Sequence, residues 1–588
     1  MTRDMIAERQ WIKESAILLF LVVAIIAIAL PRSLFGMDME DEGWLLTAYQ
    51  NIFSHPSSVS YNFLYYNGVV AGGIYNLMFC EYGIVAFRIM HVLLEVFKAL
   101  LVYFLLRKYC NKYAIAVGFI IYEIIFNAYT FIDHNQVSAL LSLLAIFFIV
   151  KSLEQKKYIY MLIGGAVVGI NVFTRIPNIA FCALILVLGV YWIDTRNHRE
   201  TFFLFLSAIG GFVIGGVLEM LMMCCLGHFH IFVDNIACGF SASGDADSTH
   251  NLASMGKTYF GQLLDFWYQI APIALLGCMF WYTKKKLQSI NKKVYYCVLA
   301  GLSLLTVILA YNQHHSQMDN RLYAMLTIIG IYIILKASSM HKYIATLALL
   351  FVYIMPLGSD WGYWSNIVFQ GMCLSVSFTI AYLLTELSRR ELQKDIFMLP
   401  ICIFAFVVFG YSTYKGAKQC IRDCKNLSSE VRKDDVHSRL ATAIYVGDYW
   451  STRLNPLLDE MAKYVKPGDV VLCYQSPAMV HYLTETLPYL DNAWPWTYTS
   501  SEMERHFAKA KAESDILPII VREKGWVSDI FNEDNYPDWD NSEAIENRFH
   551  KNKKIKLIQD FIKDNDYTVV WEDKAFQILV PPTNRIEP

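Results

Sequence analysis

The sequence predicts an α-helical polytopic membrane protein of about 13 transmembrane helices, followed by a C-terminal mixed α/β extracytoplasmic domain. Three observations predict this fold class. The chain is 55% hydrophobic and only 17% charged, whereas soluble proteins carry about 25% charged residues. Long apolar runs recur up to residue 414. Beyond it, charged residues are dense and no run is long enough to cross a membrane. We therefore expect a membrane domain over 1–414 and a soluble domain over 415–588.

The apolar runs are candidates for transmembrane helices, because about 20 apolar residues cross a hydrocarbon layer of about 30 Å. They lie near residues 12–30, 84–106, 113–131, 136–153, 159–173, 176–193, 201–226, 267–283, 294–311, 321–336, 343–355, 365–385 and 396–414. The Gly-rich segment 67–79 is too short to cross, and we expect it to dip into the membrane or to lie at its surface.

Lysine and arginine residues indicate the orientation of these spans, since cytoplasmic loops retain them. With the N-terminus in the cytoplasm, the inner loops hold eighteen Lys and Arg residues and the outer loops hold four, namely Arg32, Arg175, Lys257 and Arg321. The expected protein therefore lies in the plasma (inner) membrane with a cytoplasmic N-terminus. After an odd number of spans, the C-terminal domain is expected on the extracytoplasmic, periplasmic side.

The C-terminal domain is expected to combine helices with a small sheet. Short apolar runs predict strands at Asp469–Tyr474, Ile516–Val521, Tyr567–Trp571 and Phe576–Val580, the last two as a hairpin. Helical spacing of apolar residues predicts helices over 454–465, 501–513 and 543–564.

The first outer loop, within residues 31–66, is strongly acidic. Four carboxylates lie in five residues directly after the first span, at Asp38, Glu40, Asp41 and Glu42. Apolar residues then recur at helical spacing from Trp44 to Phe53. This pattern predicts an amphipathic helix on the membrane surface with Asp41 and Glu42 at its N-terminus. The residues alone leave two interpretations open, a solvated acidic loop and a set of functional carboxylates.

The second outer loop, residues 131–135, is very short and places Asp133, His134 and Asn135 between two spans. A carboxylate beside an imidazole can orient a proton acceptor or bind a metal ion. The alternative is a polar hinge in which Asn135 begins the next helix.

Three arginines near the outer surface are candidates for binding an anionic group. Arg88 shares one face of the second span with three further ionisable residues, His91, Glu95 and Lys98. We expect those three to pair internally and Arg88 to meet an anionic head group. Arg175 and Arg321 lie at the outer ends of other spans, where each can bind a substrate phosphate. Arg175 can equally extend its side chain to a lipid phosphate.

The long outer loop expected over 227–266 contains Asp245 and Asp247. An Asp-x-Asp pair is a weak sign of a metal site. In a loop rich in Ser and Gly we expect these carboxylates to be solvated and mobile.

Together these motifs resemble the GT-C superfamily of membrane glycosyltransferases, which includes the protein O-mannosyltransferases and the lipid A aminoarabinose transferases. In that superfamily an Asp-Glu pair opens an amphipathic helix after the first span, as Asp41-Glu42 does here. Asp133 matches a second acidic position between spans three and four, and Arg88 matches an arginine near the outer start of span two. Gly43 departs from the pattern, in which a bulkier residue often follows the pair. The chain also lacks a Trp-Trp-Asp-Tyr-Gly motif, which argues against en bloc transfer to asparagine.

The resemblance implies transfer of a sugar from a polyprenyl-phosphate donor to an acceptor hydroxyl on a glycan, lipid or protein, with inversion at the anomeric carbon. It implies Asp41 as general base, with Glu42 and Asp133 as further catalytic residues. The candidate substrate-binding residues are Asp38, Glu40, Arg88, His134, Asn135, Arg175 and Arg321. The implied cofactor is a divalent cation, Mg²⁺ or Mn²⁺, with Asp41 and Asp133 as its ligands.

Two other functions are candidates. A transporter or flippase for a lipid-linked sugar would use the same charged residues without chemistry, but such folds often contain two pseudo-repeated halves. The sequence shows no internal repeat. A polysaccharide polymerase would favour a large outer loop with arginines, and residues 227–266 contain none. A net charge of −2 without a basic stripe argues against a nucleic-acid partner.

Overall fold

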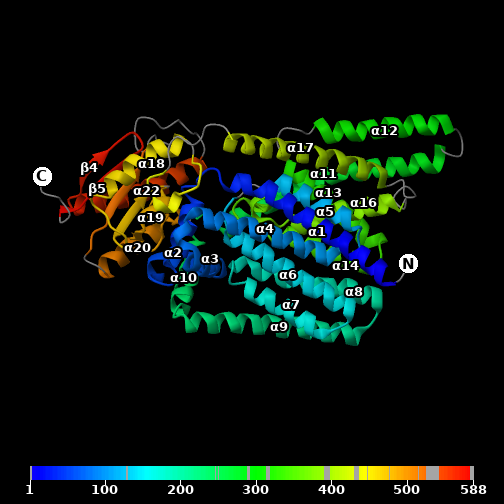
Figure 1. The fold of residues 1–588 in the computed structure, drawn as a ribbon, viewed down its shortest axis with the longest axis horizontal. Coiled ribbons are helices and arrows are strands. Elements are labelled where there is room, and N and C mark those ends of the chain that lie inside the picture. Colours follow the sequence, from blue (N-terminus) through cyan, green and yellow to red (C-terminus); the bar gives the residue numbers. More distant parts are fainter. Residues whose placement is uncertain are drawn as a thin grey trace.

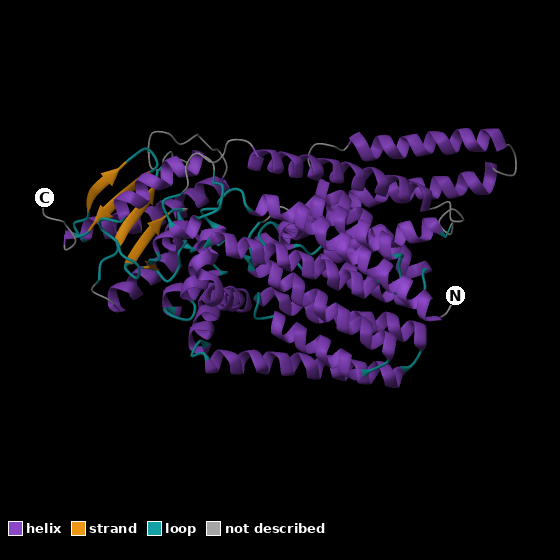
Figure 2. Ribbon diagram, in the orientation of Figure 1, coloured by secondary structure: helices purple, strands orange, loops and turns teal. Residues whose placement is uncertain are grey.

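The computed structural model describes residues 3–126, 130–245, 247–248, 250–287, 292–312, 318–389, 398–428, 436–446, 448–475, 477–513, 516–524 and 542–582. Helices run along most of the molecule, and the strands gather at the end that holds the C-terminus, far from the N-terminus (Figure 1; Figure 2). The predicted fold class, a mostly helical membrane protein with a small C-terminal mixed sheet, is confirmed.

The membrane unit consists of helices joined by short connections. Its α-helices are α1 (Arg3–Ser33), α2 (Asp41–Asn51), α3 (Tyr66–Phe79), α4 (Ile84–Leu106), α5 (Lys112–Phe126), α6 (His134–Gln155), α7 (Tyr158–Asn171), α8 (Val187–Thr195), α9 (His198–Cys225), α10 (Phe229–Ala242), α11 (Leu252–Leu287), α12 (Lys292–Asn312), α13 (Met318–Lys336), α14 (Ser339–Ile354), α15 (Asn366–Phe369), α16 (Cys373–Ser388) and α17 (Met398–Ser428). Its 3-10 helices are η1 (Pro56–Tyr65), η2 (Cys80–Tyr82), η3 (Ile176–Leu186) and η4 (Gly362–Ser365).

Eleven of the thirteen predicted spans fall largely on one of these helices, whereas 176–193 is divided between η3 and α8 and 365–385 runs over η4, α15 and α16. Within the described residues, seven helices are long and apolar enough to cross a membrane, and four shorter apolar helices accompany them. The helical character of the spans is thus confirmed, whereas their number as membrane crossings stays a prediction. The last of these helices, α17, continues past residue 414 to Ser428.

The helix after the acidic loop forms as predicted, but it has no face open to water. Nine of the eleven residues of α2 are buried. The reason is packing on several sides, because α2 contacts α3 and η1 of the membrane unit and α19 of the C-terminal unit. The polar face that an amphipathic helix would expose to water is thus covered by protein.

The segment 227–266, predicted as a long loop, is largely helical. It contains α10 and the first turns of α11. Its acidic pair is only partly exposed: Asp245 accepts a hydrogen bond from Thr499 Oγ1 (2.8 Å), and Asp247 accepts one from the backbone N–H of Ser500 (2.7 Å). Both carboxylates therefore bind the N-terminal end of a C-terminal helix, where N–H groups lack partners within the helix.

The C-terminal unit is an α/β domain. Its elements are α18 (Asp448–Met461), β1 (Val470–Tyr474), α19 (Ala478–Thr484), β2 (Leu487–Pro488), α20 (Ser500–Glu513), β3 (Ile519–Glu523), α22 (Ser542–Asp564), β4 (Thr568–Glu572) and β5 (Phe576–Val580). The sheet order is β2-β1-β3-β5-β4, with β2, β1 and β3 parallel and β5 antiparallel to both β3 and β4. The predicted hairpin, β4 with β5, is confirmed.

The two units are joined by backbone contacts around the acidic loop. Gly36 donates its N–H to the carbonyl of Tyr445 (2.8 Å), and Met479 donates its N–H to the carbonyl of Met39 (3.0 Å). Gly43 is needed for this approach, because a Cβ there would lie 2.2 Å from the backbone nitrogen of Met479. The glycine at this position therefore lets α19 pack directly on α2.

Replacing Gly43 with alanine is expected to push α19 away from α2. Overpacking of this kind costs about 1–3 kcal/mol, so the thermal midpoint of the purified protein should fall. Gly189→Ala is the matched control, because a Cβ at Gly189 meets nothing within 4 Å. Equal midpoints for the two variants would contradict the direct packing of α19 on α2.

Candidate active site

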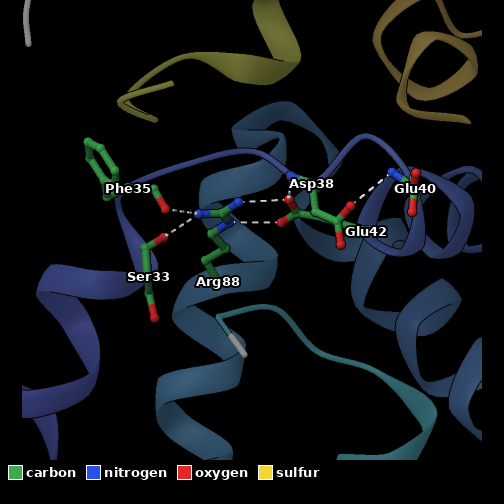
Figure 3. A network of polar contacts seen from close by, with 6 residues as sticks. All are labelled: Ser33, Phe35, Asp38, Glu40, Glu42 and Arg88. Carbon is green, nitrogen blue, oxygen red and sulfur yellow. Dashed lines mark hydrogen bonds and ion pairs between the residues drawn. The ribbon is translucent and has the colours of Figure 1, made fainter. Parts of the chain in front are cut away.

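Arg88 and Glu42 form a buried ion pair that fixes the acidic loop (Figure 3). Arg88 donates from Nε to Oε1 of Glu42 (2.8 Å) and from Nη2 to Oε2 (2.7 Å). Its Nη1 donates to the carbonyls of Ser33 (3.1 Å) and Phe35 (3.0 Å). Both charged side chains are almost completely buried. One guanidinium thus ties the end of α1, the loop and the start of α2 to α4. Arg88 therefore binds groups of the protein itself, whereas the sequence predicted that it would meet an anionic head group.

Asp38 extends the hydrogen-bond network of Arg88 and Glu42. Its backbone N–H donates to Oε2 of Glu42 (3.2 Å), and its Oδ1 accepts from the backbone N–H of Glu40 (2.9 Å) (Figure 3). Burial raises the pKa of the Asp38 carboxyl to about 7, and the charge of Asp41 adds to the effect. Asp38 and Glu42 therefore shape the loop around Asp41.

Asp133 caps the N-terminus of α6. Its Oδ1 accepts from the backbone N–H of Gln136 (2.8 Å), and its Oδ2 accepts from the side-chain amide of Asn135 (2.7 Å). Tyr49 of α2 donates its hydroxyl to the carbonyl of Ile132 (3.1 Å), which fastens the acidic helix to this loop. Burial raises the pKa of Asp133 to about 6, with a further contribution from the charge of Asp41. The two predicted carboxylates, Asp41 and Asp133, thus interact electrostatically.

His134 lies against Tyr65, at the end of η1. The ring centroids of these two residues are 4.0 Å apart. A Cβ at Gly68 would lie 2.6 Å from the Cβ of His134, so this glycine allows α3 to approach α6. Among the described residues, Nδ1 of His134 and Oδ1 of Asn135 are buried without a hydrogen-bond partner. Unsatisfied buried polar atoms are rare in folded proteins and require a partner such as water, an ion or a ligand.

Arg175 adds a positive charge near Tyr65, which also neighbours His134. Burial raises the pKa of the Tyr65 phenol, while the charge of Arg175 lowers it and that of Asp41 raises it. Arg175 donates to the carbonyls of Met355 (3.0 Å) and Leu357 (3.2 Å). A further carboxylate, Asp360, also acts on Tyr65. The structure therefore gathers residues from four segments of the chain that lie far apart in the sequence.

The other candidate residues lie away from the residues around Tyr65. Arg321 is buried near the start of α13 and interacts with Tyr411 of α17. Deeper in α4, Lys98 donates to Glu95 (2.6 Å), which confirms the pairing of these two residues. His91 instead hydrogen-bonds Gln136 of α6.

Sequence reasoning missed Tyr65 and Asp360. Tyr65 stands in an apolar run without a charged neighbour, so its sequence carried no signal. Asp360 opens the stretch Asp360-Trp361-Gly362-Tyr363-Trp364. This stretch combines an acid, a glycine and three aromatic residues between two spans. Such a combination is a sequence signal that could have marked Asp360 as a candidate site residue.

The raised pKa of Asp133 predicts a pH-dependent stability. Asp133 binds its proton more tightly in the folded protein than in the unfolded chain. The folded protein therefore loses stability as the pH rises from the unfolded pKa of this group, near 4, to its folded pKa, near 6. The free energy of unfolding should therefore fall by roughly 2 kcal/mol more in the wild type than in Asp133→Asn between pH 4 and pH 7. Unfolding in detergent at pH 4 and pH 7 measures the difference. A difference between the two proteins that does not change with pH would contradict the buried setting of Asp133.

The oxygen atoms near Asp133 suit a hard cation. Mg²⁺ is commonly held by one or two carboxylates together with substrate phosphates and water, and the interacting pair Asp41 and Asp133 provides two carboxylates. Asn135, whose side-chain amide donates to Asp133, adds an unpartnered oxygen, Oδ1. Within the described part of the chain, no group of three or more His, Cys, Asp and Glu side chains could hold a metal. Oxygen atoms of this kind are the ligands that a divalent cation shared with a substrate phosphate prefers.

Comparisons with known proteins found one family model and several solved structures. Residues 73–217 match the model of the dolichyl-phosphate-mannose-protein mannosyltransferase family. No curated protein matches the chain in sequence. The oligosaccharyltransferase of Archaeoglobus fulgidus, in complex with Zn and sulfate, is 13% identical with a TM-score of 0.45, over 86% of this chain and 68% of its own. ArnT from Cupriavidus metallidurans, bound to undecaprenyl phosphate, is 12% identical with a TM-score of 0.40, over 97% of this chain and 99% of its own.

The matched segment runs from α3 into α9 and contains Arg88, Asp133, His134 and Arg175. The part of the chain that carries these residues is therefore similar to the protein mannosyltransferase family, which confirms the resemblance over residues 73–217.

Proposed function

We propose that this protein transfers a sugar from a polyprenyl-phosphate donor to an acceptor hydroxyl at the extracytoplasmic face of the membrane, with inversion at the anomeric carbon. The observation that carries the proposal is the cluster around Tyr65: the ring of His134 lies 4.0 Å from its ring, and the charges of Asp41 and Arg175 act on it. Asp133, next to His134, interacts in turn with Asp41 and Arg175. The matched family model, named for a dolichyl-phosphate mannose donor, supports the donor class.

Asp41 acts as the general base. Displacement at the anomeric carbon needs a group that removes the proton of the acceptor hydroxyl, and a positioned carboxylate does this. Glu42 neighbours Asp41 but is held by Arg88 on both of its oxygens. We therefore assign to Glu42 and Arg88 the task of positioning Asp41, and to Asp38 and Glu40 the task of shaping the loop around it.

Arg175 contacts the phosphate of the donor. Two of its hydrogen bonds go to the carbonyls of Met355 and Leu357, and a guanidinium has five N–H donors. Its plane lies over the ring of Phe369, with 4.4 Å from the central carbon to the ring centroid. A guanidinium held in this way presents a fixed charge to the leaving phosphate, which is the form of electrostatic stabilisation that costs no reorganisation.

His134 and Asn135 bind the substrate through their buried, unpartnered atoms. A divalent cation, Mg²⁺ or Mn²⁺, would be held by Asp41 and Asp133 and would neutralise charge on the donor phosphate. The domain over 415–588 covers this face, since α19 packs on α2. The orientation of the chain in the plasma (inner) membrane rests on the distribution of Lys and Arg residues.

The test is a reconstitution of the purified protein in lipid vesicles with a panel of polyprenyl-phosphate hexoses and pentoses. The acceptors are a serine- and threonine-containing peptide, lipid A and an oligosaccharide. Release of polyprenyl phosphate together with a glycosylated acceptor is expected for at least one pair. Movement of intact donor between leaflets without its consumption would instead identify a transporter.

A further inference from the structure

The segment 355–364, which we call the Trp361 loop, joins α14 to η4 and is held unusually firmly. Tyr259 of α11 donates to the carbonyl of Pro356 (2.6 Å) and accepts from the N–H of Ser359 (3.1 Å). Gln262, one turn further on α11, donates to the carbonyl of Trp361 (2.9 Å) and accepts from the N–H of Tyr363 (2.6 Å). Connecting loops are normally mobile, so a loop fixed by these side chains is built to hold a shape.

Two glycines allow this shape. Gly358 and Gly362 have φ angles of +90° and +63°, which residues with a Cβ rarely adopt. A Cβ at Gly358 would lie 2.2 Å from the ring of Pro177, and a Cβ at Gly362 would lie 2.5 Å from Gln262. The loop is therefore pressed against η3 on one side and α11 on the other.

This fixed backbone exposes two side chains, the carboxylate of Asp360 and the indole of Trp361. Asp360 is exposed, and 66% of Trp361 is exposed, whereas the next aromatic residue, Tyr363, is buried. Holding a backbone rigid while leaving two neighbouring side chains uncovered is how a binding surface is preorganised.

The Trp361 loop lies beside the candidate active site. Ser138 of α6 contacts Met355, with 3.7 Å between Oγ and Sδ. Ser138 is five residues beyond Asp133, which is about 7.5 Å along a helix. Arg175 binds the carbonyls of Met355 and Leu357 at the start of the loop. The loop and the acidic residues thus share α6 and Arg175 as supports.

A tryptophan near a membrane surface often does no more than anchor the chain among lipid head groups. That role needs neither a rigid backbone nor an adjacent carboxylate. A pyranose ring needs both features that the loop offers, because its C–H face stacks on an aromatic ring and its hydroxyls donate hydrogen bonds to a carboxylate.

We propose that Asp360 and Trp361 form a saccharide subsite that binds a pyranose ring, with the indole beneath the ring and the carboxylate accepting hydrogen bonds from its hydroxyls. The proposal rests on the proposed function in one respect, namely that the ring belongs to the donor sugar or to a glycan acceptor.

Binding is measured by saturation-transfer-difference NMR on the full-length protein in lipid nanodiscs, with the methyl α-pyranosides of mannose, glucose and galactose as probes. Asp360→Asn and Trp361→Leu should each weaken binding of the best probe by about tenfold, and Trp361→Phe should weaken it less. Trp267→Leu is the matched control, because Trp267 is similarly exposed, at 60%, on the transmembrane helix α11. Equal binding by Trp361→Leu, Asp360→Asn and the wild type, or no binding by the wild type, overturns the subsite.

Kinetics then separate the two sources of the ring. With the donor and acceptor found in vesicles, a raised KM for the polyprenyl-phosphate sugar in Trp361→Leu assigns the ring to the donor. A raised KM for the acceptor alone assigns it to the acceptor glycan. If wild-type protein releases no polyprenyl phosphate but binds a pyranoside through Asp360 and Trp361, the proposed function fails and the subsite stands.

Discussion

Asp41→Asn should lower the rate of sugar transfer by about 10²- to 10⁴-fold, which is the usual contribution of a general base. Asparagine has nearly the same size and shape as aspartate but cannot accept the proton of an acceptor hydroxyl. Since Glu42 is bound on both oxygens by Arg88, it is not placed to substitute for Asp41. The measurement is kcat for release of polyprenyl phosphate in vesicles.

The control for this variant is Asp234→Asn, which removes an exposed carboxylate from α10. It should retain wild-type activity. The thermal midpoint of Asp41→Asn should stay close to that of the wild type, which would exclude unfolding as the cause of inactivity. Full activity in Asp41→Asn would remove this residue from the reaction and leave Asp133 as the remaining candidate base.

Arg88→Met should produce the largest loss of stability of any variant considered. Removing one partner of a buried ion pair costs about 3–5 kcal/mol, because the other charge is left buried and uncompensated. Here the loss also includes hydrogen bonds to the carbonyls of Ser33 and Phe35. The free energy of unfolding in a mild detergent gives the magnitude.

A double-mutant cycle separates the charge from the packing. Arg88→Met with Glu42→Met removes both charges, so the double variant should be more stable than Arg88→Met alone. It should not regain wild-type stability, because the two carbonyls remain without their donor. If the double variant lost as much stability as Arg88→Met and Glu42→Met together, the two residues would not act as a unit.

The sequence predicted the membrane helices and most of the sheet for physical reasons. Apolar runs of about 20 residues have few alternatives in lipid, and the strands Val470–Tyr474 and Phe576–Val580 are dense in apolar and aromatic residues. Two elements of the C-terminal unit were missed. Leu487–Pro488 is too short for any pattern. The seven-residue helix α19 forms where it is buried against α2, which is a tertiary effect.

The sequence pointed to several of the residues that the structure brings together, but not to Tyr65 or Asp360, and it did not separate the roles of the carboxylates. The acidic loop and the Asp133 loop were found because carboxylates are rare beside membrane spans. Four carboxylates in five residues carry no sign of which one faces the site, and that depends on Arg88, which lies 46 positions after Glu42. The helix α10 was not predicted because its fourteen residues are too few to cross a membrane. The first turns of α11 were not predicted because polar residues such as Lys257 and Asp265 interrupt the apolar pattern there.

The most direct test of the account is the fate of the donor in vesicles that contain only the purified protein, the donor and the acceptor. A polyprenyl-phosphate sugar labelled in both its lipid and its sugar distinguishes transfer from transport. The account predicts that the wild-type protein releases one polyprenyl phosphate for each sugar transferred, and that Asp41→Asn releases almost none. Intact donor moved to the other leaflet, with no release by the wild type, would contradict it.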